Sequence, residues 1–459
     1  MSRIPSRPEV RAELDRSLPA RVRAAVAATR AVNALSRRLG TGSGTVAGGH
    51  AGLAVDPKLL EHLTAGRRVA LVSGTNGKTT TTRLLAVALE GALGPVATNA
   101  TGSNMPTGHV TALAVSLPGA PAVLEVDEGY LPGLVRTLAA EVVVLLNLSR
   151  DQLDRTNEVR MVSNRWRTAL SGSPATAVVA NADDPLVVWA ASAADKPTWV
   201  AAGLSWRKDA VGCPACAGRV EFASAGEGGW ECACGFARPR LDVVLDGDEI
   251  VLADGRRHRL ALALPGRFNR ANAVMAAAAS SAMGVGWEEA LRRIAEVDEV
   301  AGRFSIVEVG GCTARVMLAK NPAGWRELLD LVSPGGRPVV VGINARVADG
   351  KDPSWLWDVP FERLRGRRVI ATGERCRDLS VRLRYAEVAH RTVRDEVAAV
   401  RAAWMAHGGA APGDGRASGE GAGDGADAED PGGAVGVDFI GNYTAFTDVM
   451  ARAAARTHA

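Results

Sequence analysis

Long apolar runs are missing from this sequence, although 47% of its 459 residues are hydrophobic. A membrane-spanning helix needs about 20 consecutive apolar residues, and none of the apolar stretches approaches that length. The N-terminus also lacks the charged, then apolar, then small-residue order of a secretory signal. These absences predict a soluble, unprocessed, cytoplasmic protein. Its length is enough for about three domains of ~150 residues.

Charge of one sign is also scarce, because the net charge is only +4. Proteins dedicated to nucleic-acid binding usually carry a dense basic face, so we predict no nucleic-acid partner. A disulfide framework is absent as well. Four of the six cysteines lie together between residues 213 and 234, and in a cytosolic chain such a cluster indicates a metal site.

A glycine-rich loop follows the apolar run at residues 69–72 and precedes a helical pattern of leucines. The order strand, glycine loop, helix turns backbone N–H groups toward an anion at the helix N-terminus, so we predict ATP binding. Lys78 would contact the terminal phosphates, and the Thr79 hydroxyl would reach Mg²⁺. The predicted ATP contacts in this loop are Gly74, Thr75, Asn76, Gly77, Lys78, Thr79 and Thr80.

Acidic side chains stand at the end of the next apolar run, residues 122–126. Carboxylates at the end of a buried strand near a phosphate loop are natural Mg²⁺ ligands. Glu125 is the preferred candidate because it lies inside the apolar run, whereas Asp127 also fits a solvated surface position. Further apolar runs at 141–147 and 176–180 alternate with helical stretches, which predicts a doubly wound parallel sheet.

The four clustered cysteines are Cys213, Cys216, Cys232 and Cys234. Two close thiol pairs on tight turns can surround one Zn²⁺ tetrahedrally, and four thiolates leave no open position, so the zinc would be structural. We expect Gly218 and Gly235 to let the two turns form. A redox pair or free thiols are the alternatives. Cys312 and Cys376 are isolated and are expected to be buried small hydrophobes.

The N-terminal 50 residues predict one basic helix followed by a glycine-rich linker over 40–52. Such a helix can rest on an anionic membrane, but packing on the neighbouring domain is the favoured interpretation. Near the other end, residues 408–436 are rich in glycine and acidic residues and predict a disordered insertion without chemistry.

A second α/β domain is predicted after a hinge near Gly302, with strands at 305–309, 314–318, 338–343, 368–371 and 437–440. Just before it, Asn269 and Asn272 lie three residues apart at a helix start, where both can face a nucleotide; capping is the alternative for Asn269. The polar loops 318–324 and 344–359 follow strands, and the second carries two tryptophans. We expect a ligand or partner to bind there.

The sequence resembles the Mur ligase superfamily through GTNGKTT, the stretch 147–154 with NADDP, and GRFNRxN followed by AGRF. The four-cysteine insertion, LAKNPAG and DGKDPSWLWDVPFE are similar to the MurT-like subunits of lipid II isoglutaminyl synthases. This second resemblance runs from about residue 50 to the end, apart from the acidic insertion. Amino-acid-adding members typically have a lysine where this chain reads Asn164-Arg165-Trp166, and that departure argues against an incoming amino acid.

The resemblance implies a Mur-ligase-type central domain over 51–300, with a zinc ribbon inserted at 210–238, and a Rossmann-like C-terminal ligase domain over 301–459. It implies ATP-dependent amidation of the D-glutamate α-carboxylate in the lipid II stem through an acyl phosphate, at the inner membrane face. Ammonia would come from a GatD-type glutaminase subunit.

The implied site includes Arg303 near the nucleotide and Lys320 near the developing charge. Asp352, or as second choice Asp349, would complete the partner's Cys-His pair; helix capping is the alternative for either. Two other functions are open. A stand-alone Mur or folylpolyglutamate-type amino-acid ligase would need no partner, and a non-catalytic zinc-ribbon scaffold would bind no nucleotide.

Overall fold

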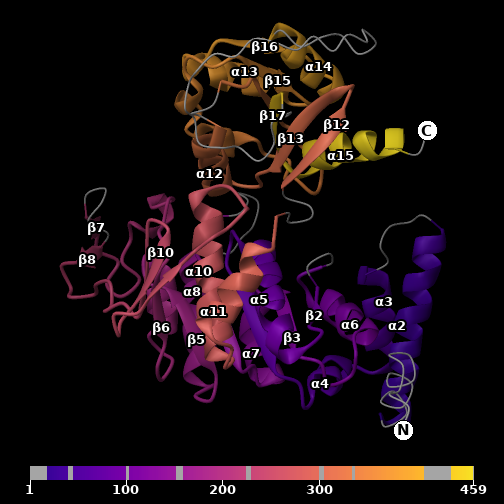
Figure 1. The fold of residues 1–459 in the computed structure, drawn as a ribbon, viewed down its shortest axis with the longest axis vertical. Coiled ribbons are helices and arrows are strands. Elements are labelled where there is room, and N and C mark those ends of the chain that lie inside the picture. The colour runs from indigo at the N-terminus through magenta and orange to yellow at the C-terminus, as the bar shows by residue number, and fades with distance from the viewer. Residues whose placement is uncertain are drawn as a thin grey trace. The chain divides into compact units, whose positions relative to one another are not determined.

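The computed structural model describes residues 18–39, 45–99, 103–150, 159–223, 229–298, 304–332, 336–407 and 436–457. These residues form two compact units, one ending at Asp298 and one made of the described residues after it, and each is built on its own sheet (Figure 1). Within the described ranges, no helix combines the length and the hydropathy that crossing a bilayer requires.

The sheet of the first unit has nine strands in the order β11-β10-β9-β6-β5-β4-β1-β3-β2. Neighbours from β2 to β9 in this order pair in parallel, whereas β9, β10 and β11 pair antiparallel. The central strands are buried on both faces, which is why they read as continuous apolar runs. The strands are β1 (Val69–Ser73), β2 (Ala97–Thr98), β3 (Ala122–Val126), β4 (Val142–Leu145), β5 (Ala177–Asn181), β6 (Thr198–Ala201), β9 (Val243–Asp246), β10 (Glu249–Leu252) and β11 (Arg257–Arg259).

Helices cover both faces of this sheet, as the alternation of strands and helices predicts. Alternate residues of the central strands share one buried cluster with α7 (Leu131–Leu138), α8 (Val159–Ser171) and α9 (Pro185–Ala191). The other face is covered by α5 (Lys78–Leu93), α10 (Arg267–Ala282) and α11 (Trp287–Ala295), which pack against one another (Figure 1). The doubly wound parallel arrangement is therefore confirmed.

The N-terminal basic helix is present as α2 (Ala20–Arg38), and it packs on α3 (Thr45–Val55). The linker predicted over residues 40–52 is wrong for its described part, because residues 45–52 belong to α3. Its glycines permit close packing instead of flexibility. A Cβ on Gly48 would lie 1.9 Å from Asn33 Oδ1, and one on Gly49 would lie 2.1 Å from the carbonyl oxygen of Thr107 in α6 (Pro106–Val115). A short helix, α4 (Leu59–Thr64), leads into β1.

The cysteine-bearing insertion stands between β6 and β9. It contains the short helix η1 (Lys208–Ala210) and an antiparallel pair, β7 (Val220–Phe222) with β8 (Trp230–Cys232). Its small core gathers the buried cysteines with Trp230 and Phe222.

The second unit has six strands in the order β12-β13-β17-β14-β15-β16. All neighbours are parallel except the β12-β13 hairpin. The five predicted strands are confirmed, whereas the edge strand β16 was not predicted. The strands are β12 (Phe304–Val309), β13 (Cys312–Leu318), β14 (Val339–Gly342), β15 (Val369–Thr372), β16 (His390–Thr392) and β17 (Val437–Gly441).

The chain's last strand, β17, lies in the middle of this sheet, between β13 and β14. The helices are α12 (Pro322–Val332), η2 (Ser354–Trp357), η3 (Phe361–Leu364), α13 (Cys376–Tyr385), α14 (Glu396–Ala406) and α15 (Tyr443–Thr457). Cys312 and Cys376 are buried as predicted. Residues 408–435, most of the predicted disordered insertion, lie outside the described residues.

Candidate functional site

The predicted phosphate loop leaves β1 at the centre of the first sheet, where β3 and β4 flank it. The three carboxyl ends therefore meet at one edge. Gly77, the residue before α5, has φ +86°, a left-handed conformation that favours glycine. A Cβ on Gly77 would lie 2.3 Å from Asn272 Oδ1, and one on Gly74 would lie 2.8 Å from Leu146 Cβ. The loop thus passes closely between the start of α10 and the end of β4.

Asn147, two residues after the end of β4, holds the loop in place. Its Oδ1 accepts from the Asn76 N–H at 2.9 Å, its Nδ2 donates to the Asn76 carbonyl at 3.0 Å, and its own carbonyl accepts from the Thr75 N–H at 2.9 Å. The Thr75 hydroxyl bonds the backbone of Ser149. We predicted ATP contacts for Thr75 and Asn76, and here both fix the loop. A polar residue at a strand end is visible in the sequence, but by itself it did not predict this role for Asn147.

Lys78 is buried and folds back over its own loop. Its Nζ lies 2.5 Å from the Gly74 carbonyl oxygen, 3.2 Å from that of Thr75 and 3.3 Å from Glu128 Oε2. Phosphate oxygens are the natural competitors for such an ammonium, because hydrogen bonds to charged acceptors are the stronger ones. Glu128 follows β3 by two residues, whereas the carboxylate predicted there as a Mg²⁺ ligand is that of Glu125.

Trp166 in α8 is fully buried and positions Glu128. Its indole Nε1 donates to the Glu128 carbonyl oxygen at 2.9 Å. This helix is the one on which the resemblance led us to look for a lysine. A tryptophan indole cannot be carbamylated as a lysine can, so it provides no carboxylate for a metal. Here the helix supports the acidic loop through a hydrogen bond to its backbone.

Glu125 lies on β3 with its backbone fixed on both sides. Asn99 bonds the Glu125 N–H at 2.8 Å and its carbonyl at 2.9 Å, and His109 Nε2 bonds the same carbonyl at 2.8 Å. Burial lowers the pKa of His109, so its ring is neutral and donates from Nε2. Among the described residues, the Glu125 carboxylate forms no ion pair or hydrogen bond. That carboxylate and the Thr79 hydroxyl are oxygen ligands of the kind Mg²⁺ prefers.

The predicted asparagine pair is only partly brought to the loop. Asn272 faces Gly77, whereas the Asn269 side chain donates to the Pro265 carbonyl at 2.7 Å, a local bond that is not a helix cap because the cap position of α10 is Gly266. Arg303 and the acidic residues Asp151 and Asp154 lie outside the described residues.

Asp184, at the N-terminus of α9, supports the loop after β4 through hydrogen bonds to its backbone. Its fully buried carboxylate accepts from the backbone N–H groups of Leu148 at 2.8 Å and Leu186 at 2.9 Å. Burial raises the pKa of Asp184 to about 6, against the lowering effect of these hydrogen bonds. It belongs to the NADDP motif, which signalled the family but not this supporting role.

The four clustered cysteines converge, with all sulfur atoms within 4.8 Å of one another. Cys213 Sγ lies 3.8 Å from Cys234 Sγ, and Cys216 Sγ lies 3.5 Å from Cys232 Sγ. Tetrahedral Zn²⁺ with Zn–S bonds of about 2.3 Å separates sulfurs by about 3.8 Å, so the donor set fits such an ion.

One of the two predicted turn glycines is corrected. Gly235 has φ +87°, as expected for a tight turn. At the first cysteine pair, however, Ala217 takes the left-handed conformation at φ +63°. Gly218 serves close approach instead, because a Cβ there would lie 3.1 Å from Cys216 Sγ.

The two candidate aspartates both lie in the loop after β14 in the second unit, and they differ in burial. Asp349 is buried, and both of its oxygens accept hydrogen bonds from Thr444. Asp352 is exposed and accepts only a local bond, from the Ser354 N–H at 2.8 Å, among the contacts described for it.

Of the two tryptophans in this loop, Trp355 does not offer its ring to a ligand or partner. It is buried, with its ring centre 6.1 Å from that of Trp325, whereas Trp357 is 55% exposed and contacts Tyr385. Lys320, in the other predicted loop, lies 5.2 Å from the centre of the Tyr443 ring.

Two family models match the chain, the Mur ligase middle domain over residues 72–280 and the MurT ligase C-terminal domain over residues 318–406. Together they cover well over half of the sequence. The chain belongs to the Mur ligase family. As a Mur ligase it is an ATP-dependent enzyme, and the phosphate loop, Glu125 and Thr79 lie within the matched middle domain.

Curated relatives of this Mur ligase include two MurT subunits of lipid II isoglutaminyl synthase (glutamine-hydrolyzing). The one from Streptococcus pneumoniae is 28% identical over 377 residues, 75% of this chain and 82% of the relative. The one from Staphylococcus aureus (strain COL) is 29% identical over 342 residues, 70% and 78% of the two chains.

Among solved structures, a pseudomurein peptide ligase type C from Methanothermus fervidus has the same fold. Its TM-score is 0.59 at 19% identity, covering 86% of this chain and 79% of the other. The likeness extends over both sheet-bearing units of the Mur ligase fold.

Proposed function

We propose that this chain catalyses ATP-dependent amidation of the D-glutamate α-carboxylate in the lipid II stem. The central domain, 51–300, binds ATP, and the C-terminal domain, 301–459, serves the second half-reaction. The observation that carries the proposal is the phosphate loop with its buried Lys78, in a chain whose relatives are MurT subunits of lipid II isoglutaminyl synthase. The site of action follows from the substrate and is the inner face of the membrane.

The first half-reaction activates the carboxylate. A free carboxylate is a poor electrophile, so its oxygen attacks the γ-phosphate of ATP and ADP leaves, giving an acyl phosphate. The Lys78 ammonium leaves the Glu128 carboxylate and binds the phosphate oxygens instead, where it stabilises the charge that develops on them. Mg²⁺ would be held by Thr79 and Glu125 and supplies further charge neutralisation. Arg303, Asn269 and Asn272 complete the nucleotide site.

The second half-reaction uses ammonia. Ammonia attacks the acyl carbon and phosphate leaves, giving D-isoglutamine. The absence of a lysine from the stretch 164–166 supports ammonia over an amino acid as the nucleophile, because that helix offers no carbamylated side chain for a second Mg²⁺. A GatD-type glutaminase partner would supply the ammonia from glutamine. That the relatives are named as subunits supports the need for a partner.

Asp352 is the residue proposed to act on the partner. An exposed carboxylate can orient the imidazole of a Cys-His pair and stabilise its cation, so glutamine hydrolysis would depend on assembly of the complex. The exposure of Asp352 supports this choice, whereas both Asp349 oxygens are already occupied within the chain.

The experiment is co-expression with a glutaminase encoded in the same genome, followed by phosphate release and stem-peptide mass with lipid II, ATP and glutamine. Replacing a carboxyl OH by NH₂ gives a small mass decrease, which should require the partner and vanish in Lys78→Ala. Asp352→Asn should block the reaction with glutamine but not with ammonium, and Asp358→Asn in the same segment is the matched control. A larger mass gain without the partner would instead identify an amino-acid ligase.

A further inference from the structure

The loop that carries Asp352 begins at Asn344, two residues after the end of β14, and is tied at three points to the chain's last segment. The first point is a reciprocal pair of amide contacts. Asn442 Oδ1 accepts from the Asn344 N–H at 3.1 Å, and Asn442 Nδ2 donates to the Asn344 carbonyl at 2.6 Å. Because β17 lies beside β14, this contact fixes the first residue of the loop to the sheet.

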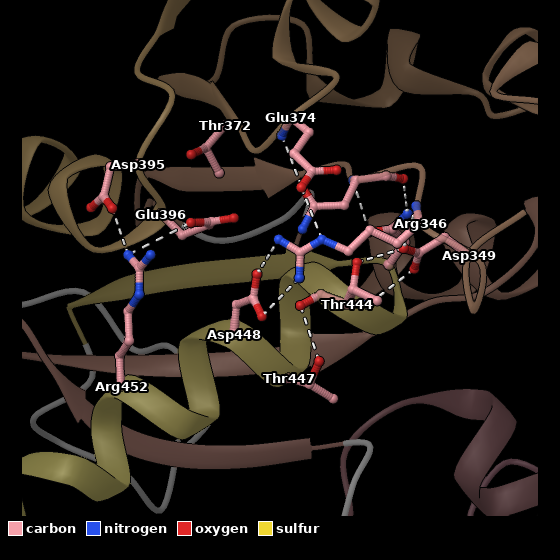
Figure 2. Close-up of polar contacts among 12 residues, drawn as sticks. Arg346, Asp349, Thr372, Glu374, Asp395, Glu396, Thr444, Thr447, Asp448 and Arg452 are labelled. Carbon is pink, nitrogen blue, oxygen red and sulfur yellow. Dashed lines mark hydrogen bonds and ion pairs between the residues drawn. The ribbon is translucent and has the colours of Figure 1, made fainter. Parts of the chain in front are cut away.

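The second point is an ion pair on the outer side of the loop. The Arg346 guanidinium lies over Asp448 of α15 in a two-pronged arrangement, with Nη1 3.2 Å from Oδ1 and Nη2 2.9 Å from Oδ2 (Figure 2). Its Nε donates to Glu374, before α13, at 2.9 Å. Both carboxylates raise the pKa of Arg346, so the side chain stays charged.

The third point is the buried carboxylate of Asp349. The Thr444 N–H, in the first turn of α15, donates to its Oδ1 at 2.9 Å, and the Thr444 hydroxyl donates to its Oδ2 at 2.5 Å (Figure 2). The carboxylate also accepts from the Arg346 N–H at 3.2 Å, which closes the loop on itself. Asp349 therefore caps α15 and holds the loop at the same time.

The chain turns outward immediately after this anchor. Gly350 has φ +81°, which a side chain would disfavour, and Asp352 follows two residues later in an exposed position. Only the short span from Gly350 to Asp352 separates the buried anchor from the exposed carboxylate. The position of Asp352 is thus set by contacts made through Asp349 and Arg346.

We infer that Arg346 and Asp349, with Thr444 and Asp448 on α15, are positioning residues that hold Asp352 ready for the glutaminase partner. This inference rests on the proposed function of Asp352. If the loop samples other conformations, only the competent fraction of complexes hydrolyses glutamine, and the rate is reduced to that fraction of its full value. The activation of glutamine hydrolysis then depends on the C-terminal helix as well as on Asp352.

Thr444→Val tests the inference, because it removes the hydroxyl and keeps the shape. Losing one hydrogen bond to a buried charge changes a conformational equilibrium by about 10- to 100-fold. In the purified complex, we expect glutamine-driven amidation to fall by up to about that factor, since the competent fraction cannot fall by more than the equilibrium constant does, and kcat should change more than the KM for glutamine. Ammonium-driven amidation should stay at the wild-type rate, and Thr444→Ser should restore most of the loss.

Two matched controls lie on the same helix. Thr447→Val removes a hydroxyl whose one hydrogen bond within the described residues is to the Thr444 carbonyl, at 3.0 Å. Arg452→Gln removes a guanidinium paired with Asp395 and Glu396, away from the loop (Figure 2). Its side chain is 48% exposed against 44% for Arg346, so Arg346→Gln and Arg452→Gln differ mainly in the partner they lose. Only Arg346→Gln should lower glutamine-driven amidation.

The outcomes separate this inference from the proposed function. If Asp352→Asn retains glutamine-driven amidation, the role of Asp352 is wrong. If Asp352→Asn loses it but Thr444→Val and Arg346→Gln match their controls, the proposed function stands and the positioning role is wrong. An equal fall in ammonium-driven amidation in Thr444→Val would also overturn the positioning role, because it would mean general damage to the ligase.

Discussion

Replacing Gly77 by alanine perturbs the phosphate loop at one defined atom. Gly77 has φ +86° and stands directly before α5. Its missing Cβ would lie 2.3 Å from Asn272 Oδ1. Gly94, at the other end of the same helix, has φ +76° but would place its Cβ in open space. Gly94→Ala is therefore a control at a second positive-φ glycine without the collision, although its ψ of −164° differs from the −8° of Gly77, which is αL.

The two substitutions carry different backbone costs, and only Gly77→Ala also moves Asn272. The αL conformation of Gly77 costs a residue with a Cβ about 1–2 kcal/mol, and the sparsely populated conformation of Gly94 costs about 1–3 kcal/mol. In Gly77→Ala, the Asn272 side chain must also retreat by roughly 1 Å to reach ordinary contact, and an off-rotamer side chain costs about 0.5–1.5 kcal/mol. We expect a loss of about 1.5–3.5 kcal/mol for Gly77→Ala and of about 1–3 kcal/mol for Gly94→Ala, so ATP affinity is the measurement that distinguishes them.

The assay measures denaturant midpoints and the ATP dissociation constant for both variants. Gly94→Ala should bind ATP like the wild type, because its strain lies at the far end of α5. Gly77→Ala should bind ATP about 2- to 10-fold more weakly, because the cost of about 0.5–1.5 kcal/mol for moving Asn272 falls on the loop that binds the phosphates and each 1.4 kcal/mol is a factor of ten. Equal stability losses together with equal ATP affinities in the two variants would refute the reasoning, because the contact with Asn272 would then be of no consequence.

Two further predictions concern the cysteine cluster and a buried histidine. Cys213→Ser should lose zinc and destabilise the insertion, because the ion then lacks one of four thiolates. Cys312→Ser, at a buried cysteine outside the cluster, should keep the zinc. Elemental analysis of the purified proteins measures the zinc content, and equal zinc in both variants would contradict the site. Burial lowers the pKa of His109 below its ordinary 6.5, so the unfolded chain binds a proton that the folded chain does not, and the free energy of unfolding should decrease as the pH falls through about 6.5. His109→Gln cannot titrate there and should lack that part of the pH dependence, measured as denaturant midpoints across the range; identical slopes in both proteins would count against it.

The order of neighbouring residues in the sequence was enough to predict the phosphate loop and most strands. The sequence from Val69 to Leu89 already contains a strand, a glycine loop and a helix, and its chemistry needs no distant residue to be recognised. The cysteine pairs were equally local. Glycine was less reliable, because Gly48 and Gly49 suggested a linker but serve close packing of α3 on α2 and α6. Glycine permits both flexibility and close approach, and only the neighbouring backbone distinguishes them.

The sequence by itself determined that a nucleotide loop, a four-thiolate cluster and two α/β sheets exist, because each is encoded by neighbouring residues and by strand and helix periodicity. Only the tertiary structure decided which distant residues meet them. Asn147 fixes the loop from 71 positions away, and Thr444 reaches Asp349 across 95. Both contacts depend on strand order, which places β4 beside β1 and the chain's last strand beside β14. Contacts between residues so far apart in the sequence depend on how the chain packs. The sequence alone therefore does not distinguish Asp349, which is buried with both oxygens hydrogen-bonded, from Asp352, which is exposed.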